Sequence, residues 1–437
     1  MTSPTTDFVS ELQWRGLIAQ TTGEPELRAH LASATRRGYA GFDPTSDSFT
    51  IGNMVPMMLL AHFQRAGHIP VVVGGGGTGL IGDPSGKTAE RQLLTREKVE
   101  ANVASQKRIF EKIIDFSGPR AGIMVNNADW LCAISYLEAL RDIGKYFSVN
   151  AMIQKESVRE RLSNRDQGIS YTEFSYMVLQ AYDFLHLHQK HGVTMQLGGS
   201  DQWGNITAGT DLIRKVHAAS GSTGPAPDVH GLTTPLITKA DGTKFGKTES
   251  GAVWMTADRT SPYAFYQFWL NADDADVERF LKTFTFLPRE RIEELMLLQK
   301  SNPGAREAQR ALARSVTEML HGKTELDHAE AAAKALFSGE IAGLPEKTLL
   351  EALASVPSSD QPRTQLEGDG VPILDLLVTT GLAASKREAK EFLAGGSVAL
   401  NGRKVGPEDR ARTADLLHGS IIALRRGKKN WHVTRWK

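Results

Sequence analysis

The chain has 437 residues, so it is too long for a single hydrophobic core and predicts about two to four domains. Hydrophobic residues make up 41% of the chain and charged residues 23%, which is typical of an ordinary soluble globular protein. The net charge of +1 excludes an overall electrostatic case for nucleic-acid binding, so any such surface must be local.

The N-terminal segment and the lone cysteine bear on location. Residues 1–15 lack the basic end and apolar core of a secretory signal. No apolar run approaches the roughly 18 residues of a membrane span. Cys132 is the one cysteine, which excludes an internal disulfide, and because it lies in an apolar run we expect it to be buried. We therefore expect a cytoplasmic protein with no membrane partner.

The first half alternates short β-branched runs with longer helical patterns, which predicts an α/β domain with a parallel sheet. Two runs, at 69–73 and 193–197, are each followed directly by glycines. Between them, residues 171–184 repeat at helical spacing. Because ligands bind at the carboxyl ends of parallel strands, the two glycine runs predict two walls of one pocket.

Composition changes twice in the second half. Residues from about 261 to 354 follow helical spacing, and residues 355–370 are rich in Pro, Ser, Asp and Gly, which predicts a linker. Residues 371–437 hold thirteen Lys and Arg against six Asp and Glu, a local charge of +7. This last segment is where the sequence favours contact with RNA.

Three segments carry the functional pattern. They are Tyr39-Ala-Gly-Phe-Asp-Pro-Thr-Ser-Asp-Ser-Phe-Thr-Ile-Gly-Asn53, Gly198-Gly-Ser-Asp-Gln-Trp-Gly204 and Lys239-Ala-Asp-Gly-Thr-Lys-Phe-Gly-Lys-Thr248. The first resembles the HIGH-type nucleotide-binding motif of class I aminoacyl-tRNA synthetases, and the third resembles their KMSKS-type loop. Their order and spacing, with the middle segment, resemble the bacterial tyrosyl-tRNA synthetases along nearly the whole chain.

The resemblance implies a fold and a reaction. We expect a class I Rossmann-like parallel-sheet catalytic domain, then an α-helical domain and a small α+β RNA-binding domain. The implied reaction joins L-tyrosine to ATP, taken with Mg²⁺, and then passes tyrosine to the 3′ end of tRNA(Tyr). The family also implies a homodimer with a contact near 144–150. No bound prosthetic group and no resident metal site are expected.

The implied domains follow the changes in composition. Residues 1–260 are expected to bind tyrosine and ATP and to form the dimer contact. Residues 261–354 would form the helical anticodon-binding domain, residues 355–370 the linker, and residues 371–437 the RNA-binding domain. In the last of these, a stretch that includes Gly396 to Gly402 resembles the small RNA-binding domain of many bacterial relatives.

The chemistry requires positioned cations and donors rather than a base. The carboxylate of the amino acid is already ionised, so the enzyme contributes positioning and stabilises the added negative charge of the transition state. By resemblance, the catalytic set is Thr45, Thr50, Lys244, Lys247 and Thr248. In this chain the HIGH-type tetrad is Thr50-Ile-Gly-Asn53, so threonine and asparagine replace two histidines of the usual motif.

The same resemblance supplies two binding sets. The residues expected to bind tyrosine are Tyr39, Asp83, Asn127, Tyr176, Gln180, Asp183 and Gln202. Those expected to bind ATP are Asp43, Gly52, Asn53, Gly199, Asp201, Lys244 and Lys247. Independently of the family, three of the tyrosine set are spaced four and three residues apart, which places them on one helix face.

The residues expected to bind RNA lie on one basic helix. Lys386, Arg387 and Lys390 are separated by one, three and four residues, so they can share a face and meet phosphates. A basic helix that only contacts solvent is the alternative interpretation.

Two rival functions remain at the sequence level. Gly77-Thr-Gly-Leu-Ile-Gly82 fits the GxGxxG pattern of a dinucleotide-binding dehydrogenase, but Asp-Pro follows at once, where a helix should continue. The second rival is a catalytically silent RNA-binding relative, which Thr50 and Asn53 favour. The charged residues of the expected pocket argue against it, because a pure RNA-binding module does not use them.

Overall fold

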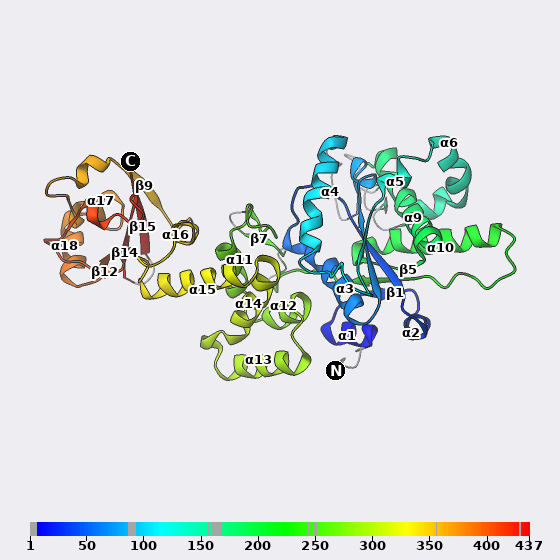
Figure 1. The fold of residues 1–437 in the computed structure, drawn as a ribbon, viewed down its shortest axis with the longest axis horizontal. Helices are drawn as coiled ribbons and strands as arrows, with labels where there is room; N and C mark the ends of the chain where they lie inside the picture. Colours follow the sequence, from blue (N-terminus) through cyan, green and yellow to red (C-terminus); the bar gives the residue numbers. More distant parts are fainter. Residues whose placement is uncertain are drawn as a thin grey trace. The chain divides into compact units, whose positions relative to one another are not determined.

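The computed structural model describes residues 7–85, 93–155, 158–159, 162, 168–240, 242, 245–248, 251–354, 356–427 and 430–437. The chain forms two compact units. The first unit combines Met1–Arg259 with Ala272–Leu320, and the second combines Thr260–Asn271 with His321–Lys437. Figure 1 shows the elements in sequence colours. Within the described residues, no helix is both long and apolar enough to cross a membrane.

A six-stranded sheet forms the centre of the first unit, in the order β1-β6-β5-β2-β3-β4. The strands are β1 (Gln20–Thr21), β2 (Arg37–Phe42), β3 (Ile69–Gly74), β4 (Ile123–Asn126), β5 (Val193–Gly199) and β6 (His230–Thr234). All neighbours are parallel except β1, which runs antiparallel to β6. The valines of β3 are almost fully buried, as a strand covered on both faces requires. The predicted fold class is confirmed.

Helices cover both faces of this sheet. Those of the first unit are α1 (Phe8–Arg15), α2 (Glu24–Ser33), α3 (Met54–Arg65), α4 (Arg96–Phe110), α5 (Ala128–Leu131), α6 (Tyr136–Glu138), α7 (Val149–Ile153), α9 (Tyr171–His191), α10 (Trp203–Ala219), α12 (Val277–Phe284), α13 (Arg289–Ser301) and α14 (Glu307–His321). Helices α9 and α10 pack together on one face, and α4 lies on the other (Figure 1).

The long helix α9 has clear local start and stop signals. The Ser170 side chain accepts a hydrogen bond from the Glu173 backbone N–H, which caps the first turn. The helix ends at Gly192, whose φ of 62° is the left-handed conformation that glycine adopts without steric strain. Because both ends are fixed, the buried face of α9 is held in register against β5.

The order of the strands places a crevice beside β2. The chain leaves β2 for β3 on one side, whereas β5 pairs with β2 on the other side. The order therefore reverses at β2, and the carboxyl ends of β2 and β5 lie next to each other. A reversal of this kind is where open α/β sheets bind ligands.

Cys132 corrects one sequence expectation. It is exposed and reduced, although its apolar surroundings predicted burial. It follows the short helix α5, in which Trp130 takes the inward position and is only 7% exposed. The apolar run therefore buries its largest side chain and leaves the cysteine outside.

The second unit is α+β. Its main sheet has the order β12-β11-β14-β15-β9, and a two-stranded sheet pairs β10 with β13. The strands are β9 (Ser358–Gln361), β10 (Val371–Pro372), β11 (Val398–Leu400), β12 (Arg403–Lys404), β13 (Arg410–Ala411), β14 (Ile421–Arg426) and β15 (Asn430–Trp436). The helices are α11 (Pro262–Leu270), α15 (Lys323–Ser338), α16 (Glu346–Ala352), α17 (Ile373–Thr379) and α18 (Lys386–Ala394).

The predicted linker at 355–370 requires correction. Within it, β9 pairs in parallel with β15, from Ser358 opposite Val433 to Gln361 opposite Trp436. The polar composition of this stretch suggested a linker, but an edge strand is held by backbone hydrogen bonds and tolerates polar side chains. The C-terminal sheet therefore includes residues that precede 371.

Candidate active site

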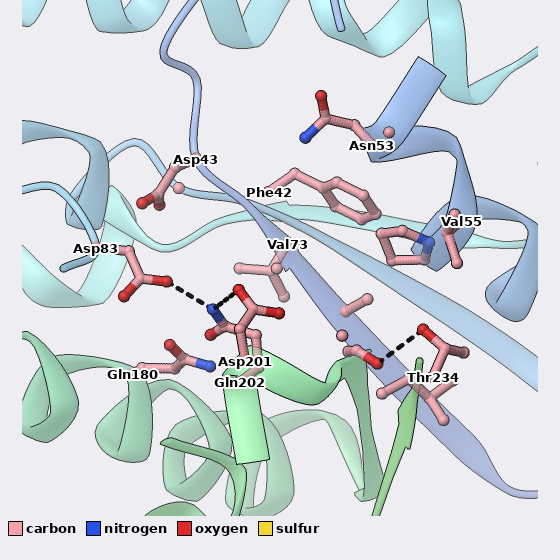
Figure 2. A pocket seen from close by; sticks show the side chains of 18 of the residues that line it. Phe42, Asp43, Asn53, Val55, Val73, Asp83, Gln180, Asp201, Gln202 and Thr234 are labelled. Atoms are coloured by element: carbon pink, nitrogen blue, oxygen red, sulfur yellow. Dashed lines mark hydrogen bonds between the residues drawn. The ribbon is translucent and has the colours of Figure 1, made fainter. Parts of the chain in front are cut away.

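A cavity of about 590 Å³ opens at the carboxyl ends of β2 and β5. Figure 2 shows polar side chains from several elements pointing into it, among them Asp43, Asp83, Gln180, Asp201 and Gln202. A cavity of this size suits a small molecule together with part of a nucleotide. Both glycine-rich strand ends predicted from the sequence lie beside it, because Gly75 and Gly199 are among its lining residues.

The structure gathers most of the sequence-predicted residues at this cavity. Those that line it are Tyr39, Asp43, Thr45, Gly52, Asn53, Asp83, Tyr176, Gln180, Asp183, Gly199, Asp201 and Gln202. Asn127 lies behind the wall, where it contacts Asp183, and Thr50 is not among the lining residues.

Asp183, on α9, is held by two nitrogen donors. Asn127 Nδ2 donates to its Oδ2 at 2.9 Å, and Trp130 Nε1 donates to its Oδ1 at 2.7 Å. The residue is only 4% exposed. Burial raises the pKa of Asp183 to about 7, although the hydrogen bonds from Asn127 and Trp130 act to lower it. The carboxylate can therefore accept a further hydrogen bond from a ligand in the cavity.

Tyr39, on β2, contributes a second polar group to the same end of the cavity. Its side chain is 1% exposed, and its ring packs edge-on against Phe184 at 5.3 Å. Among the residues that the structure describes, its buried hydroxyl has no hydrogen-bond partner. Burial, and then the charge of Asp183, raise the pKa of Tyr39 well above its usual value. The hydroxyl therefore stays neutral and can donate or accept.

Two further carboxylates form the polar wall. Asp43 accepts from Tyr176 Oη at 3.0 Å and from Thr78 Oγ1 at 2.8 Å. Asp83 accepts from Gln202 Nε2 at 2.7 Å (Figure 2). Burial, and then the charge of Asp43, raise the pKa of Tyr176 well above its usual value. Negative charge is thus concentrated on one side of the cavity, which favours a cationic group of the ligand.

One asparagine orients two amides of this wall. Asn205 Nδ2 donates to Gln180 Oε1 at 3.0 Å and to Gln202 Oε1 at 3.2 Å. Since both oxygens accept from Asn205, the two amide nitrogens face away from it, and that of Gln202 reaches Asp83. The wall is therefore arranged by hydrogen bonds among its own side chains.

The first motif segment is capped by its own residues. Thr50 Oγ1 donates to Asn53 Oδ1 at 2.9 Å, and the Thr50 backbone N–H donates to the same oxygen at 3.2 Å. The Thr50 hydroxyl is thus engaged locally in this structure. Asn53 lines the cavity as predicted, with its amide at the rim (Figure 2).

The first and third motif segments are brought together through Val253. Its backbone N–H donates to Gly246 O at 2.9 Å, and its carbonyl accepts from Ile51 N at 3.1 Å. Gly246 has a φ of 81°, and a Cβ there would lie 3.0 Å from Ile51 Cγ1. Only glycine suits this position, because the backbone is left-handed and the neighbour is close. Segments about 190 residues apart in the sequence therefore share one edge of the site.

Several catalytic predictions fall beyond what the structure describes. Lys244 lies outside the described residues. Lys247 and Thr248 form the short strand β7 (Lys247–Thr248), which pairs with β8 (Gly251–Ala252), but their side chains are not described.

Sequence reasoning missed three residues that orient the site. Trp130 was assigned no role, yet it donates to Asp183. Thr78 and Asn205 were also not singled out, although they contact Asp43 and both wall amides. Only Asn205 left a signal, because it lies three residues after Gln202 on a helical stretch.

The basic residues predicted to bind RNA lie on α18 of the second unit. Lys386 pairs with Asp375 at 2.7 Å, and Arg387 pairs with Glu391 at 3.2 Å. Their side chains are 73% and 90% exposed, and Lys390 is exposed too. Exposed ion pairs of this kind are weak, so phosphates can compete for these cations.

The chain matches two protein families. Residues 33–338 match the family of class I tRNA synthetases (W and Y), and residues 353–434 match the family described as the tyrosine--tRNA ligase SYY-like C-terminal domain. Among curated proteins, the tyrosine--tRNA ligase of Dechloromonas aromatica is 50% identical over 98% of this chain and 99% of its own length. That of Bacillus caldotenax is 48% identical over 98% of this chain and 100% of its own length.

Solved structures show the same similarity. A C-terminally truncated mitochondrial tyrosyl-tRNA synthetase of Aspergillus nidulans has a TM-score of 0.67 and 34% identity. The match covers 76% of this chain and 94% of that one. A tyrosyl-tRNA synthetase of Archaeoglobus fulgidus complexed with L-tyrosine has a TM-score of 0.51 and 18% identity over 74% of this chain and 99% of its own, a likeness of fold alone.

Proposed function

This chain belongs to the class I tRNA synthetases of the tyrosine type, and we propose that its cavity performs both steps of tyrosine–tRNA ligation. In the first step, the carboxylate oxygen of L-tyrosine attacks the α-phosphorus of ATP. A new O–P bond forms as the bond to diphosphate breaks. In the second step, a 3′-terminal hydroxyl of tRNA(Tyr) attacks the carbonyl carbon, and AMP leaves.

The observation that carries this proposal is the polar end of the cavity. The Tyr39 hydroxyl, which has no hydrogen-bond partner within the described part of the chain, and the Asp183 carboxylate line the same buried space. A phenolic hydroxyl placed there would donate to Asp183 and pair with Tyr39. Phenylalanine would leave both groups unpaired, which is unfavourable for buried polar groups. This end of the cavity therefore selects tyrosine.

The wall carboxylates suit the other end of the amino acid. The α-ammonium group requires a carboxylate and further acceptors, which Asp83, Tyr176 and Gln180 supply. Gln202 is directed at Asp83 and keeps that carboxylate in position. With both ends of tyrosine held, its carboxylate would face the nucleotide side of the cavity.

The nucleotide would lie between the two motif segments. In this proposal Asp43, Gly52, Asn53, Gly199 and Asp201 bind ATP, whose phosphates enter with Mg²⁺ as part of the substrate. Lys244, Lys247 and Thr248 would stabilise the β- and γ-phosphates as the P–O bond breaks, together with Thr45 and Thr50. Because the mechanism needs no general base, the rate of the reaction depends on how the pocket positions the substrates and stabilises their charge.

Tyrosine-dependent exchange between ATP and diphosphate tests the proposal. We expect the purified full chain to exchange with tyrosine and not with phenylalanine or tryptophan. A folded protein that binds tyrosine without exchange would contradict the proposal and favour a catalytically silent RNA-binding relative. In that case, Thr50→His would test whether threonine is responsible for the loss, because it restores the residue type of the family motif.

RNA binding is proposed for the C-terminal part. We assign residues 371–437 to an RNA-binding domain, with β9 as part of its sheet, and residues 261–354 to anticodon binding. Replacing Lys386, Arg387 and Lys390 together by alanine should weaken tRNA charging and leave exchange unchanged. The slope of log affinity against log salt should fall by up to about three. Equal loss of both reactions would overturn the assignment.

A homodimer in the cytoplasm is also proposed. Large apolar side chains are exposed on α6 and α7, including Tyr136, Leu137 and Val149 at 64%, 76% and 57%. A cluster of this kind marks an interaction surface, and it adjoins the predicted contact at 144–150. Leu137→Glu should shift the sedimentation coefficient from dimer to monomer. An unchanged coefficient would exclude this face.

A further inference from the structure

A second cluster of polar side chains lies at the opposite ends of the strands that build the cavity. His30 lies in the last turn of α2, Asp228 lies two residues before β6, and His230 begins β6. The cavity uses the other end of β6, at Thr234. The potential ligand atoms of the three side chains all lie within 4.8 Å of one another. The ligase reaction assigns this cluster no role.

Asp228 contacts both imidazole rings. Its Oδ2 lies 2.5 Å from His30 Nδ1, and its Oδ1 lies 2.8 Å from His230 Nε2. The two rings are nearly buried, with side chains 2% and 5% exposed, whereas the Asp228 side chain is 61% exposed. The cluster thus has two fixed nitrogen ligands inside and one adjustable carboxylate outside, with access from solvent.

The second nitrogen of each ring, which does not contact Asp228, also has a side-chain partner. Thr194 Oγ1 lies 2.7 Å from His30 Nε2, and Thr22 Oγ1 lies 3.4 Å from His230 Nδ1. A histidine that binds a metal usually directs its second nitrogen to a protein acceptor, which fixes the tautomer and the orientation of the ring. His30 Nδ1 and Asp228 share a hydrogen bond, so a metal ion would replace the proton between them. Thr194 Oγ1 would then accept the proton that remains on His30 Nε2.

We propose that His30, Asp228 and His230 form a binding site for one divalent transition-metal ion, with Zn²⁺ as the best fit. Two imidazoles and a carboxylate are typical ligands of Zn²⁺, at about 2.0–2.2 Å. Tetrahedral geometry would separate the ligand atoms by about 3.4 Å. Asp228 is exposed and lies outside any strand or helix. Its carboxylate can therefore move outward until the ligand atoms have this separation. Water would complete the coordination sphere.

The ligand set also predicts selectivity. Mg²⁺ and Ca²⁺ prefer oxygen ligands, so a site with two imidazoles should reject them even at the concentrations used with ATP. A bound ion would join α2 to the start of β6 at the edge of the sheet. Since unfolding separates the ligands, the ion should raise the melting temperature of the full chain.

Titration of the metal-free, untagged full chain with Co²⁺ alone and with Zn²⁺ alone tests the proposal. We expect one Co²⁺ per chain with the visible absorption of a site of low coordination number. Zn²⁺ should displace it, and excess Mg²⁺ should not. Absence of a stoichiometric site would overturn the proposal and leave the cluster as a hydrogen-bond network only.

Asp228→Asn is the decisive variant. Asparagine has the same size and can donate to His30 Nδ1 while accepting from His230 Nε2, so the fold and tyrosine-dependent exchange should persist. Metal affinity should fall by at least about tenfold, because a charged ligand is lost. Affinity equal to that of the unmodified chain would contradict the site.

Two further variants separate this site from metal binding by other histidines. Thr194→Val keeps the shape of the threonine and removes the hydroxyl that holds His30, so affinity should fall by about 10- to 100-fold. His217→Gln, at a histidine outside the cluster, should leave the titration unchanged. Loss of binding in His217→Gln with retention in Thr194→Val would overturn the assignment.

Discussion

Two aspartates of the first unit each contact two side-chain nitrogens, but their pKa values are shifted in opposite directions. Asp183 accepts from two nitrogens inside the cavity, and Asp228 contacts two nitrogens at the edge of the sheet. Burial raises the pKa of Asp183 to about 7. At Asp228 partial burial acts in the same direction, but hydrogen bonds from His30 and His230 outweigh it, and the pKa is lowered.

The difference teaches that solvation, rather than the number of partners, decides the charge of these groups. Asp183 is 4% exposed, so two hydrogen bonds do not replace the water it has lost. A tyrosine hydroxyl would add a third donor. Asp228 remains largely hydrated and stays ionised without a ligand. The ionisation of Asp183 in the cavity thus depends on a hydrogen bond from the substrate. The ionisation of Asp228 at the edge of the sheet does not.

The largest expected effect comes from making the same substitution at both positions. Asp183→Asn should lower kcat/KM for tyrosine by about 10- to 150-fold, because a hydrogen bond to a charged group contributes about 1.5–3 kcal/mol. Asp228→Asn should leave the value unchanged. Exchange at subsaturating tyrosine measures both. Equal losses in the two variants would show that the effect is structural and not specific to the cavity.

The pH dependence sharpens the comparison. Asp183 is ionised above its pKa, so kcat/KM for tyrosine should rise with pH through about 7 and level off above it. Below pH 7 the value should fall by about tenfold per unit, until it meets that of Asp183→Asn. The variant itself should lack this inflection. The same inflection in both proteins would assign it to another group.

A smaller effect is expected from Trp130→Phe. This change removes the Nε1 donor to Asp183 and keeps an aromatic ring beside His186. Since that hydrogen bond lowers the pKa of Asp183, its loss should move the inflection toward higher pH by about one unit. Activity at pH 8 should fall by about twofold. An inflection that stays near pH 7 would show that Trp130 does not tune the carboxylate.

The smallest expected effect is that of Asp228→Asn on the stability of the metal-free protein. The change is mostly exposed and preserves both hydrogen bonds to the histidines, so the free energy of unfolding should change by less than about 1 kcal/mol. Denaturant melts monitored by circular dichroism measure it. A larger loss would mean that the charge of Asp228 itself holds α2 to β6.

The sequence predicted the fold class from local signals, and it predicted most of the lining residues through the family resemblance. The strands that precede the glycine runs and the helical spacing of Tyr176, Gln180 and Asp183 are readable from neighbouring residues. Roles of individual residues still rest on family resemblance. Lys244 lies outside the described residues, so its part in the reaction stays a prediction.

What sequence could not predict depends on contacts between distant residues. Trp130 reaches Asp183, and His30 reaches Asp228, only because the strands between them pair in a particular order. Spacing along the chain carries no trace of either contact. The prediction that Cys132 is buried was wrong for a related reason. An apolar stretch of sequence does not show which of its side chains points inward.

The position of β9 has a consequence for the time course of folding. Among the residues that the structure describes, this strand pairs with β15 alone, and β15 lies between β9 and β14 in the sheet. During synthesis β9 leaves the ribosome before β15 and cannot pair until β15 has emerged. Strands β14 and β15, in contrast, can form their hairpin locally as soon as both have emerged. We therefore expect the C-terminal sheet to be completed from its centre outward, with β9 as the last strand to dock.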